Sequence, residues 1–258
     1  KAITFDASWT AHTYTLRLRH NDGSNDYIDM AMTYDVAANL QTVTRTGYTF
    51  ANWSTNLDGT GITYTEGQSV TNLTATNNAI VNLYAQWTAN TYTLRLHHND
   101  GSNDYTDMAM TYDVAANLQT ITRTGYTFAN WSTNPDGTGT TYTEGQSVTN
   151  LTDVNGAIVD LYAQWTANTY TLRLHDNDGS NDYTNMAMTS DVATNLQTIP
   201  RTGYTFANWS TNPDGSGTTY TEGQSVSNLT NVNGAIVDLY AQWTANTYTV
   251  TLDNQSAT

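Results

Sequence analysis

The residues whose side chains could do chemistry are few, and histidine comes first among them. The five histidines are His12, His20, His97, His98 and His175. Nucleophilic hydrolysis needs a Ser or Thr held by a His and an orienting carboxylate, and the sequence has no such signature. Neighbouring residues of a strand point to opposite faces, so His97 and His98 cannot both ligate one metal ion. We therefore expect no catalytic residues, no cofactor and no enzymatic activity.

Acidic loops are the next candidates, because calcium takes hard oxygen ligands. The loop Asn-Asp-Gly-Ser-Asn-Asp occurs three times. Its aspartates are the candidate calcium ligands: Asp22, Asp26, Asp100, Asp104, Asp178 and Asp182. The spacing of an EF-hand loop is absent. A solvated hairpin turn is the favoured interpretation, and the prediction is that no metal is bound.

A third set consists of asparagines in Asn-x-Ser/Thr triplets, which accept glycans on secreted proteins. The triplets begin at Asn52, Asn72, Asn130, Asn150, Asn208, Asn228 and Asn254. Chance is the rival explanation, because the chain is rich in Asn and Thr. Asn52 also adjoins a tryptophan that we place in a core.

These features recur because the chain is a tandem array. The stretch GYTFANWSTN begins at Gly47 and returns at Gly125 and Gly203, a period of 78 residues. A fixed period of this size is typical of repeat architectures. The predicted segments are residues 1–11 (last strand of a preceding repeat), 12–89, 90–167 and 168–245 (repeats one to three) and 246–258 (first strand of a following repeat). The second and third repeats differ at only eight aligned positions.

Composition limits how these small units can be stabilised and what they can bind. The chain has no cysteine, so disulfides are excluded, and aromatic side chains must fill the cores. The predicted core aromatics are Trp9, Phe50, Trp53, Trp87, Phe128, Trp131, Trp165, Phe206, Trp209 and Trp243. A net charge of −15 argues against nucleic acid, whose binding needs basic patches. No apolar run approaches the ~20 residues of a membrane span, so we expect no direct insertion into a membrane.

Each unit is predicted to be built of strands. Residues 14–20 alternate apolar with polar at period two, and the Asp-Gly turn after them leads into a second antiparallel strand. Residues 48–54 and 79–87 are two further strands, and residues 63–65 add a short one. Only residues 35–41 have helical leanings. Phe50 and Trp53 have opposite parity, so either a bulge lies between them or one ring faces outward.

The joints and one exposed position bear on function. About four residues without Gly or Pro, such as Thr88 to Thr91, join one unit to the next, which predicts a semi-rigid rod. Tyr84, Tyr162 and Tyr240 fall on the outward parity of the last strand. They are a candidate contact face for glycan or protein. Packing against the adjacent repeat is the alternative.

The sequence also carries a family likeness. In the second repeat it lies in Thr91 to Leu94, Arg123 to Trp131, Asp136 to Gly139 and Leu161 to Trp165. These segments resemble the Listeria-Bacteroides repeat, the group that includes the internalin B-repeats. The resemblance covers essentially the whole chain and implies small β-grasp-like modules, used in tandem as stalk or accessory segments of bacterial surface and secreted proteins. It supplies no catalytic residues. Asn stands at positions 52, 130 and 208, where the family usually has Gly.

The expected fold is mainly β, α+β at most: three β-grasp-like repeats of 78 residues in an elongated rod. The expected function is a structural stalk, spacer or fibre shaft of a secreted or cell-surface adhesin-like protein. One alternative is a multivalent, low-affinity module that binds surface glycan or protein. Another is a filament subunit that pairs with copies of itself by end-to-end strand complementation. The partners expected in every case are the neighbouring repeats of the same chain.

Overall fold

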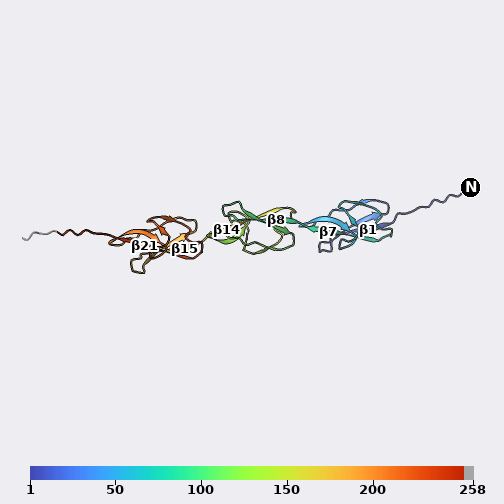
Figure 1. The fold of residues 1–258 in the computed structure, drawn as a ribbon. Coiled ribbons are helices and arrows are strands. Elements are labelled where there is room, and N and C mark those ends of the chain that lie inside the picture. Colours follow the sequence, from blue (N-terminus) through green and yellow to red (C-terminus); the bar gives the residue numbers. More distant parts are fainter. Residues whose placement is uncertain (253–258) are drawn as a thin grey trace, which may run out of the picture. The chain divides into compact units, whose positions relative to one another are not determined.

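The structure, a computed structural model, describes residues 1–252, and the part of the chain that it describes consists of strands, turns and loops with no helix (Figure 1). Each repeat contributes seven strands. Those of the first repeat are β1 (Thr13–Arg19), β2 (Tyr27–Thr33), β3 (Ala38–Asn39), β4 (Tyr48–Ser54), β5 (Thr63–Tyr64), β6 (Ser69–Val70) and β7 (Ile80–Ala89).

The second and third repeats have the same seven elements. The second has β8 (Thr91–His97), β9 (Tyr105–Thr111), β10 (Ala116–Asn117), β11 (Tyr126–Ser132), β12 (Thr141–Tyr142), β13 (Ser147–Val148) and β14 (Ile158–Ala167). The third has β15 (Thr169–His175), β16 (Tyr183–Thr189), β17 (Thr194–Asn195), β18 (Tyr204–Ser210), β19 (Thr219–Tyr220), β20 (Ser225–Val226) and β21 (Ile236–Ala245). The prediction of three tandem, mainly β repeats is confirmed.

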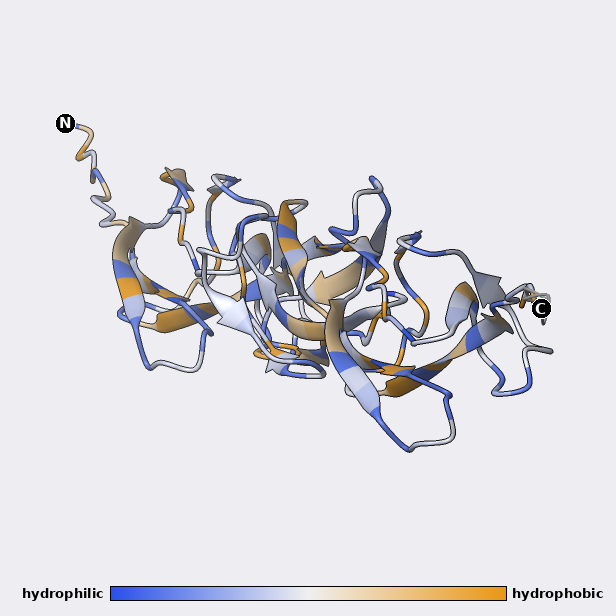
Figure 2. Cartoon of the chain, turned by 90° about the vertical axis from the view of Figure 1, so that its left-hand side faces the viewer, coloured by the Kyte–Doolittle hydropathy of each residue, from blue (hydrophilic) through white to orange (hydrophobic). Residues whose placement is uncertain are grey.

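The first strand of each repeat follows its hydrophobic alternation. In β1 the side chains of Tyr14, Leu16 and Leu18 are buried, while Arg17 and Arg19 lie on the other face. Figure 2 shows this alternation as bands of apolar and polar colour along the strands. The turn at residues 20–26 then reverses the chain, and β2 pairs antiparallel with β1, with Tyr14 opposite Met32. The predicted hairpin is confirmed.

The first repeat has a five-stranded sheet in the order β2-β1-β7-β4-β5, and the third has the equivalent order β16-β15-β21-β18-β19. The two central strands, β1 and β7, are parallel, whereas the outer pairs are antiparallel. A two-stranded ladder, β3 with β6, lies outside that sheet. In the second repeat β8 pairs with β9, and β11 pairs with β12 and β14. The finer β-grasp assignment stays a prediction.

A β-bulge resolves the parity of Phe50 and Trp53. Phe50 pairs with Trp87 and Asn52 with Gln86, so Ala51 is an extra residue in β4. The extra residue brings both rings to the same side of the sheet, with centroids 5.4 Å apart. Trp87 completes the cluster with an edge contact to Phe50 at 5.6 Å. The bulge, one of the two alternatives left open by the sequence, is therefore what the chain forms.

The segment with helical leanings, residues 35–41, is not helical. Asp35 has a φ of 65°, and its equivalents Asp113 and Asp191 each have 62°. A residue in the left-handed region cannot begin a right-handed helix. The chain instead turns at Asp35 and forms the short strand β3, whose partner β6 supplies backbone hydrogen bonds that a helical turn would have to give up.

The cores contain most of the predicted aromatics. Trp53, Trp131 and Trp209 are completely buried. Phe50, Phe128, Phe206, Trp87, Trp165 and Trp243 are half-buried around them. Trp9 is the exception, because its side chain is 91% exposed. Its equivalent Trp87 packs on Phe50 and donates its indole N–H to the carbonyl of His20 at 2.7 Å, whereas residues 1–11 form no strand in the structure.

Contacts divide the chain into two compact units. The first comprises Lys1–His97, Tyr105–Leu118 and Gly145–Leu161, and the second comprises His98–Asp104, Gln119–Glu144 and the chain from Tyr162 onward. The boundary between them runs through the second repeat. Each junction between consecutive repeats therefore lies inside one unit.

Candidate functional site: the joints between repeats

One buried asparagine makes up the whole linker between the first and second repeats. Strand β7 ends at Ala89 and β8 begins at Thr91, so only Asn90 lies between them, with 8% of its surface exposed. The sequence predicted a joint of about four residues without Gly or Pro. In the structure three of those four residues belong to strands.

Every polar group of Asn90 has a partner. Its backbone N–H donates to the carbonyl of Gly47 at 2.9 Å, and its side-chain Oδ1 accepts from the hydroxyl of Thr49 at 2.7 Å. Its carbonyl accepts from the N–H of Tyr112 at 2.9 Å, and its Nδ2 donates to the carbonyl of Asp153 at 2.7 Å. The first two partners belong to the first repeat and the other two to the second. This residue therefore ties the two repeats together from both sides.

A second contact crosses the same joint at the surface. The hydroxyl of Tyr48 donates to the Oδ2 of Asp113 at 2.8 Å, and the Nδ2 of Asn150 donates to its Oδ1 at 2.7 Å. The guanidinium of Arg45 lies 3.7 Å from the centroid of the Tyr48 ring. The hydrogen bonds from Asn150 and Tyr48 lower the pKa of Asp113, and the bond to Asp113 raises the pKa of Tyr48.

Apolar packing completes the first joint. The Tyr112 ring of the second repeat lies on Gly47, so that a methyl group added at Gly47 would overlap it. The ring also makes an edge contact with Tyr48, with centroids 5.8 Å apart. Gly47 has a φ of 75°, which favours glycine. The Tyr112 ring of the second repeat thus packs against the backbone turn at Gly47 of the first repeat.

The second joint repeats the polar contacts of the first. Asn168, 7% exposed, donates its N–H to the carbonyl of Gly125 at 2.9 Å and accepts from the hydroxyl of Thr127 at 2.7 Å. Its carbonyl accepts from the N–H of Ser190 at 2.9 Å, and its Nδ2 donates to the carbonyl of Asn231 at 2.8 Å.

The surface contact also recurs at the second joint. The hydroxyl of Tyr126 donates to the Oδ2 of Asp191 at 2.8 Å. The hydrogen bonds from Asn228 and Tyr126 lower the pKa of Asp191. Ser190, however, stands where the first joint has Tyr112.

At each end of the described array, the residue equivalent to Asn90 makes only the hydrogen bonds to the one repeat beside it. His12 stands at the place of Asn90, and its carbonyl accepts from the N–H of Tyr34 at 2.8 Å while its Nδ1 lies 3.0 Å from the carbonyl of Ala75. Asn246 donates its N–H to the carbonyl of Gly203 at 2.9 Å and accepts from the hydroxyl of Thr205 at 2.7 Å. The connecting residue thus engages whichever repeat lies beside it.

The tyrosines of the candidate contact face are half-buried beside the sheet. Tyr84 lines two surface depressions, one with Arg19 and Asp26 and the other with Asn56 and Asp58. In the third repeat His175 stacks on Tyr240, with centroids 4.5 Å apart and planes 16° from parallel. Tyr162 is half-buried too. None of the contacts described at the joints uses these three rings.

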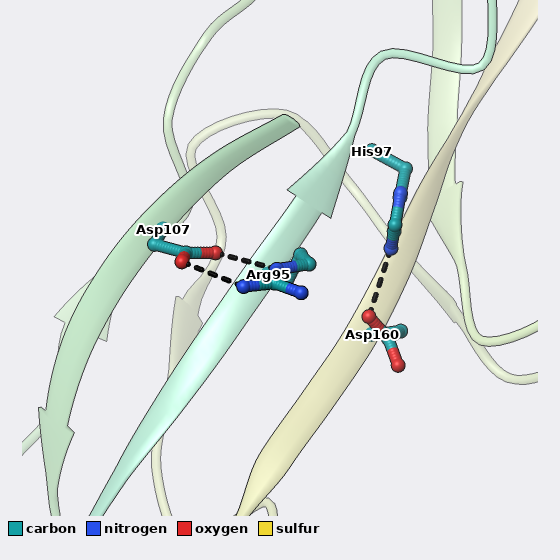
Figure 3. Close-up of polar contacts among 4 residues, drawn as sticks. All are labelled: Arg95, His97, Asp107 and Asp160. Carbon is teal, nitrogen blue, oxygen red and sulfur yellow. Dashed lines mark hydrogen bonds and ion pairs between the residues drawn. The ribbon is translucent and has the colours of Figure 1, made fainter. Parts of the chain in front are cut away.

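Histidines occur in the polar faces of the sheets, beside arginine–aspartate pairs. In the second repeat Arg95 pairs with Asp107 through two hydrogen bonds of 2.8 and 2.9 Å, and His97 lies 2.8 Å from Asp160 (Figure 3). In the third repeat both Arg173 and His175 contact Asp238, at 2.8 and 2.7 Å. Both His97 and His175 therefore have a carboxylate partner on the last strand of their own repeat.

The acidic loops are held by local hydrogen bonds. Asp22 accepts from the N–H of Ser24 at 2.9 Å, and Ser24 accepts from the N–H of Asp26 at 3.1 Å. The same turns recur around Asp100 and Asp104 and around Asp178 and Asp182. Among residues 1–252 no group of three or more His, Cys, Asp or Glu side chains could hold a metal ion. The hydrogen bonds from Ser24 lower the pKa of Asp22.

The candidate glycosylation sites fall into two structural classes. Asn52, Asn130 and Asn208 lie in strands next to buried tryptophans, and their Oδ1 atoms are enclosed. Asn72, Asn150 and Asn228 are exposed, yet each Nδ2 donates to an aspartate at 2.7 Å. Glycosylation at the second class would replace these bonds. Asn254 lies outside the described residues, and modification of the other six stays a prediction.

Sequence reasoning missed the residues that build the joints. Asn90 and Asn168 were recognised only as part of a short connection, and Tyr48, Tyr112 and Asp113 were not singled out. Asn90 and Tyr112 are 22 positions apart in the sequence, and Tyr48 and Asp113 are 65 apart. The one available signal was an asparagine between two strand patterns, since a polar residue there needs partners if it is buried.

Similarity to known proteins agrees with this repeat organisation. The family model of the Listeria-Bacteroides repeat domain matches residues 14–86, 92–164 and 170–242. Two proteins of Evansella cellulosilytica are similar to the chain. One, whose name describes it as a Gly-rich membrane protein, is 30% identical over 92% of this chain and 27% of its own length. The other, named as a membrane protein, is 28% identical over 95% of this chain and 35% of its own length.

The chain thus spans about a quarter to a third of the length of these relatives. In the part of the chain that the structure describes, no helix is long and apolar enough to cross a membrane. A solved structure, the type 2 repeat of the mucus binding protein MUB from Lactobacillus reuteri, aligns with 91% of this chain and all of its own. Its identity of 10% and TM-score of 0.16 carry no argument about this fold.

The three matched segments coincide with the three sets of strands and leave the connecting asparagines between them. The chain belongs to the Listeria-Bacteroides repeat domain family, with three tandem members of that family in its sequence.

Proposed function

We propose that the chain is a structural stalk or spacer segment of an extracellular surface protein, without enzymatic activity. The observation that carries the proposal is the joint: one residue, with all four polar groups bonded, connects each repeat to the next. A spacer must hold its ends apart, and a flexible linker would let them approach each other. The names of the relatives, which describe membrane proteins, agree with a place at the cell surface.

The bonds of Asn90 and Asn168 explain why such a joint resists bending. An amide buried without partners costs about 1–3 kcal/mol for each unmet group. A large rotation of one repeat against the next would break bonds to one side of the asparagine and leave its groups buried and unpaired. The intact geometry is therefore strongly preferred at both joints. An elongated arrangement of the array is the corresponding prediction.

The spacer function can be tested by changing repeat number. Arrays of one, two and three repeats would be displayed on a bacterial surface between an anchor and an epitope tag, with a Gly/Ser linker of equal residue number as the control. We expect the height of the tag above the surface to grow in equal steps with each repeat, and the Gly/Ser control to stay lower. A height that does not depend on repeat number would contradict a spacer.

Binding is the second candidate, favoured by the two depressions beside Tyr84. Their linings combine an aromatic ring with Asn, Asp and Arg side chains, which suits a polar ligand such as a glycan. Weak binding at several repeats would add up through avidity. Glycan-array binding that rises with repeat number and falls in Tyr84→Ala would support it. Binding that is unchanged in Tyr84→Ala would remove this site from consideration.

A filament built by strand complementation is the third candidate. Ile3, Phe5 and Trp9 are 79%, 91% and 91% exposed, whereas Leu83, the equivalent of Phe5, is completely buried. A strand from another copy could cover these side chains. Light scattering at increasing concentration tests the idea directly. A particle mass that increases with concentration, and that no longer increases in the double variant Phe5→Ser, Trp9→Ser, would support the filament. A chain that stays monomeric would refute it.

A further inference from the structure

The two joints share their polar contacts but differ in one side chain. The four hydrogen bonds of Asn90 and those of Asn168 agree to within 0.1 Å, and the Tyr–Asp bond is 2.8 Å in both. Tyr112 of the first joint is replaced by Ser190 in the second. The chain therefore contains its own comparison, in which an aromatic ring is present at one joint and absent at the other.

The ring fills the first joint. It covers Gly47, which is buried, and makes an edge contact with Tyr48. Two bodies in such contact cannot tilt toward each other without overlap, and tilting apart forfeits dispersion contacts within a fraction of an ångström. The Tyr112 ring therefore resists motion in both directions.

The second joint has a surface depression. A depression of about 250 Å³ is lined by Thr124, Gly125, Asp191, Asn228, Thr230 and Asn231. Gly125 is half-buried, unlike Gly47. Ser190 is 2% exposed, and its hydroxyl lacks a hydrogen-bond partner. A buried hydroxyl without a partner is unfavourable, and opening of the joint would admit water to it. Ser190 thus lacks the ring contacts that Tyr112 makes, and its unpaired hydroxyl favours opening of the second joint to water.

We propose that the residue at this position sets the stiffness of each joint, so that the joint containing Ser190 is more compliant than the joint containing Tyr112. The asparagine connection keeps both joints intact, while the ring decides how far the repeats can move about it. This inference goes beyond a spacer role, because it gives two joints of one array different mechanical properties. Exchange of a single residue between copies would then make a stiff joint more compliant.

Joint stiffness can be measured with spin labels on introduced cysteines. The natural sequence has no cysteine, so the introduced ones are the only labelling sites. Spin labels at the exposed positions Glu66 and Val154 span the first joint within the first compact unit, and labels at the equivalent positions Glu144 and Val232 span the second joint within the second unit. Pulsed electron paramagnetic resonance gives the distribution of each distance. We expect the second distribution to be broader than the first in the otherwise unchanged chain.

The exchange variants decide the proposal. Ser190→Tyr is expected to narrow the second distribution to the width of the first, and Tyr112→Ser to broaden the first. Tyr105→Ser, which removes an exposed tyrosine of the same repeat away from the joint, should leave both widths unchanged. Equal widths in the unchanged chain, or widths that ignore both exchanges, would overturn the proposal. If Ser190→Tyr does not fold, Tyr112→Ser alone decides.

This test is separate from that of the spacer function. Both exchanges leave Asn90 and Asn168 in place and measure one joint at a time. A spacer could therefore be confirmed with equal joints, and unequal joints could occur in a chain with another role.

Discussion

At the scale of single residues, each joint depends on one buried asparagine whose polar groups are all hydrogen-bonded. Asn90 occupies one position between two strands, where a longer linker would have to be ordered at a cost in entropy. Its amide reaches a hydroxyl on one side and a carbonyl on the other. The bond to Asp153 uses the backbone carbonyl, so the change to Asn231 in the next joint leaves it intact.

Three equivalent glycines give a graded prediction. Gly47, Gly125 and Gly203 have φ values of 75°, 77° and 79°, so alanine at any of them costs about 1–2 kcal/mol through backbone strain. A methyl group would overlap Tyr112 at Gly47, lie 3.1 Å from Ser190 at Gly125 and meet nothing within 4 Å at Gly203. We expect chemical denaturation to show the largest loss for Gly47→Ala and the smallest for Gly203→Ala.

The matched control is Gly47→Ala combined with Tyr112→Ser, which removes the overlapping ring. The loss should then shrink toward that of Gly125→Ala. Equal losses at all three glycines would show that the ring does not press on Gly47.

The Tyr48–Asp113 bond predicts a pH dependence of the first joint. The pKa of Asp113 is lowered, so its contribution is present above the ordinary value of 3.8 and is lost as the pH falls through the lower folded value. The pKa of Tyr48 is raised, so its contribution is present below the ordinary value of 10.0 and is lost as the pH rises through the higher folded value. Distance distributions across the joint should therefore broaden at both extremes.

Tyr48→Phe isolates this effect. The ring remains, but the hydroxyl that donates to Asp113 is gone. We expect the alkaline broadening to disappear in this variant and the acid broadening to diminish, because no hydroxyl at residue 48 then links Asp113 to the first repeat. An unchanged alkaline response would mean that another group controls it.

At the scale of elements, the bulge in β4 is the feature that makes each core possible. Side chains alternate across a strand, so the extra residue Ala51 is what brings Phe50 and Trp53 to one face. The sequence allowed either this solution or an outward ring. Pairing with β7 favours the bulge, because Trp87 then makes an edge contact with Phe50 and the small Ala85 lies opposite Trp53.

Deletions in β4 test this account of the bulge. Without Ala51, Phe50 and Trp53 stand two positions apart and share one face of a regular strand, whereas without Ala51 and Asn52 they are neighbours and point to opposite faces. We expect the single deletion to keep the cooperative unfolding transition of the first repeat, followed by tryptophan fluorescence, and the double deletion to abolish it while the third repeat keeps its own. Ala51→Ser, at an exposed position, is the control and should unfold almost as the unchanged chain does. A double deletion as stable as the control would contradict the need for both rings on one face.

On the polar faces of the sheets, loss of one ion-pair partner is compensated by a carboxylate on a neighbouring strand. Asp107 in β9 pairs with Arg95, but its equivalent in β16 is Asn185. Arg173 instead contacts Asp238 of β21, and the carboxylate of Asp238 also contacts the ring of His175. Exposed ion pairs contribute about 0–1 kcal/mol, so such re-pairing changes stability little. The polar faces can therefore vary while the buried faces of the same strands stay constant.

At the scale of the whole chain, the structure predicts local consequences of core damage. Trp209 is completely buried in the third repeat, and Trp209→Ala should cost about 3–5 kcal/mol in that repeat. Contacts to other repeats pass through the joints, so the first repeat should be affected only by nearest-neighbour coupling. Hydrogen exchange resolved by repeat measures this, and equal loss of protection in the first and third repeats would contradict modular stability.

Much of the fold could be predicted from the sequence, because strand alternation, turn residues and the repeat period are local or repeated signals. The first hairpin and the strands at residues 48–54 and 80–89 lie where period-two patterns placed them. The exposed Trp9 and the non-helical segment after Tyr34 could not be predicted in this way. Burial of Trp9 needs strands that the pattern of residues 1–11 cannot supply, and the φ of Asp35 is fixed by its bonds to Asn72.

The amino-acid sequence by itself determined the array: three copies of one strand pattern, an aromatic core for each and a connection too short to be flexible. Tertiary structure alone decided what that connection does. The partners of Asn90, Tyr48 and Tyr112 lie in neighbouring repeats, far from them in the sequence or on strands that must first form. Hydrogen bonds and ring contacts act over a few ångströms in space, so only the folded chain reveals which residues hold the repeats together.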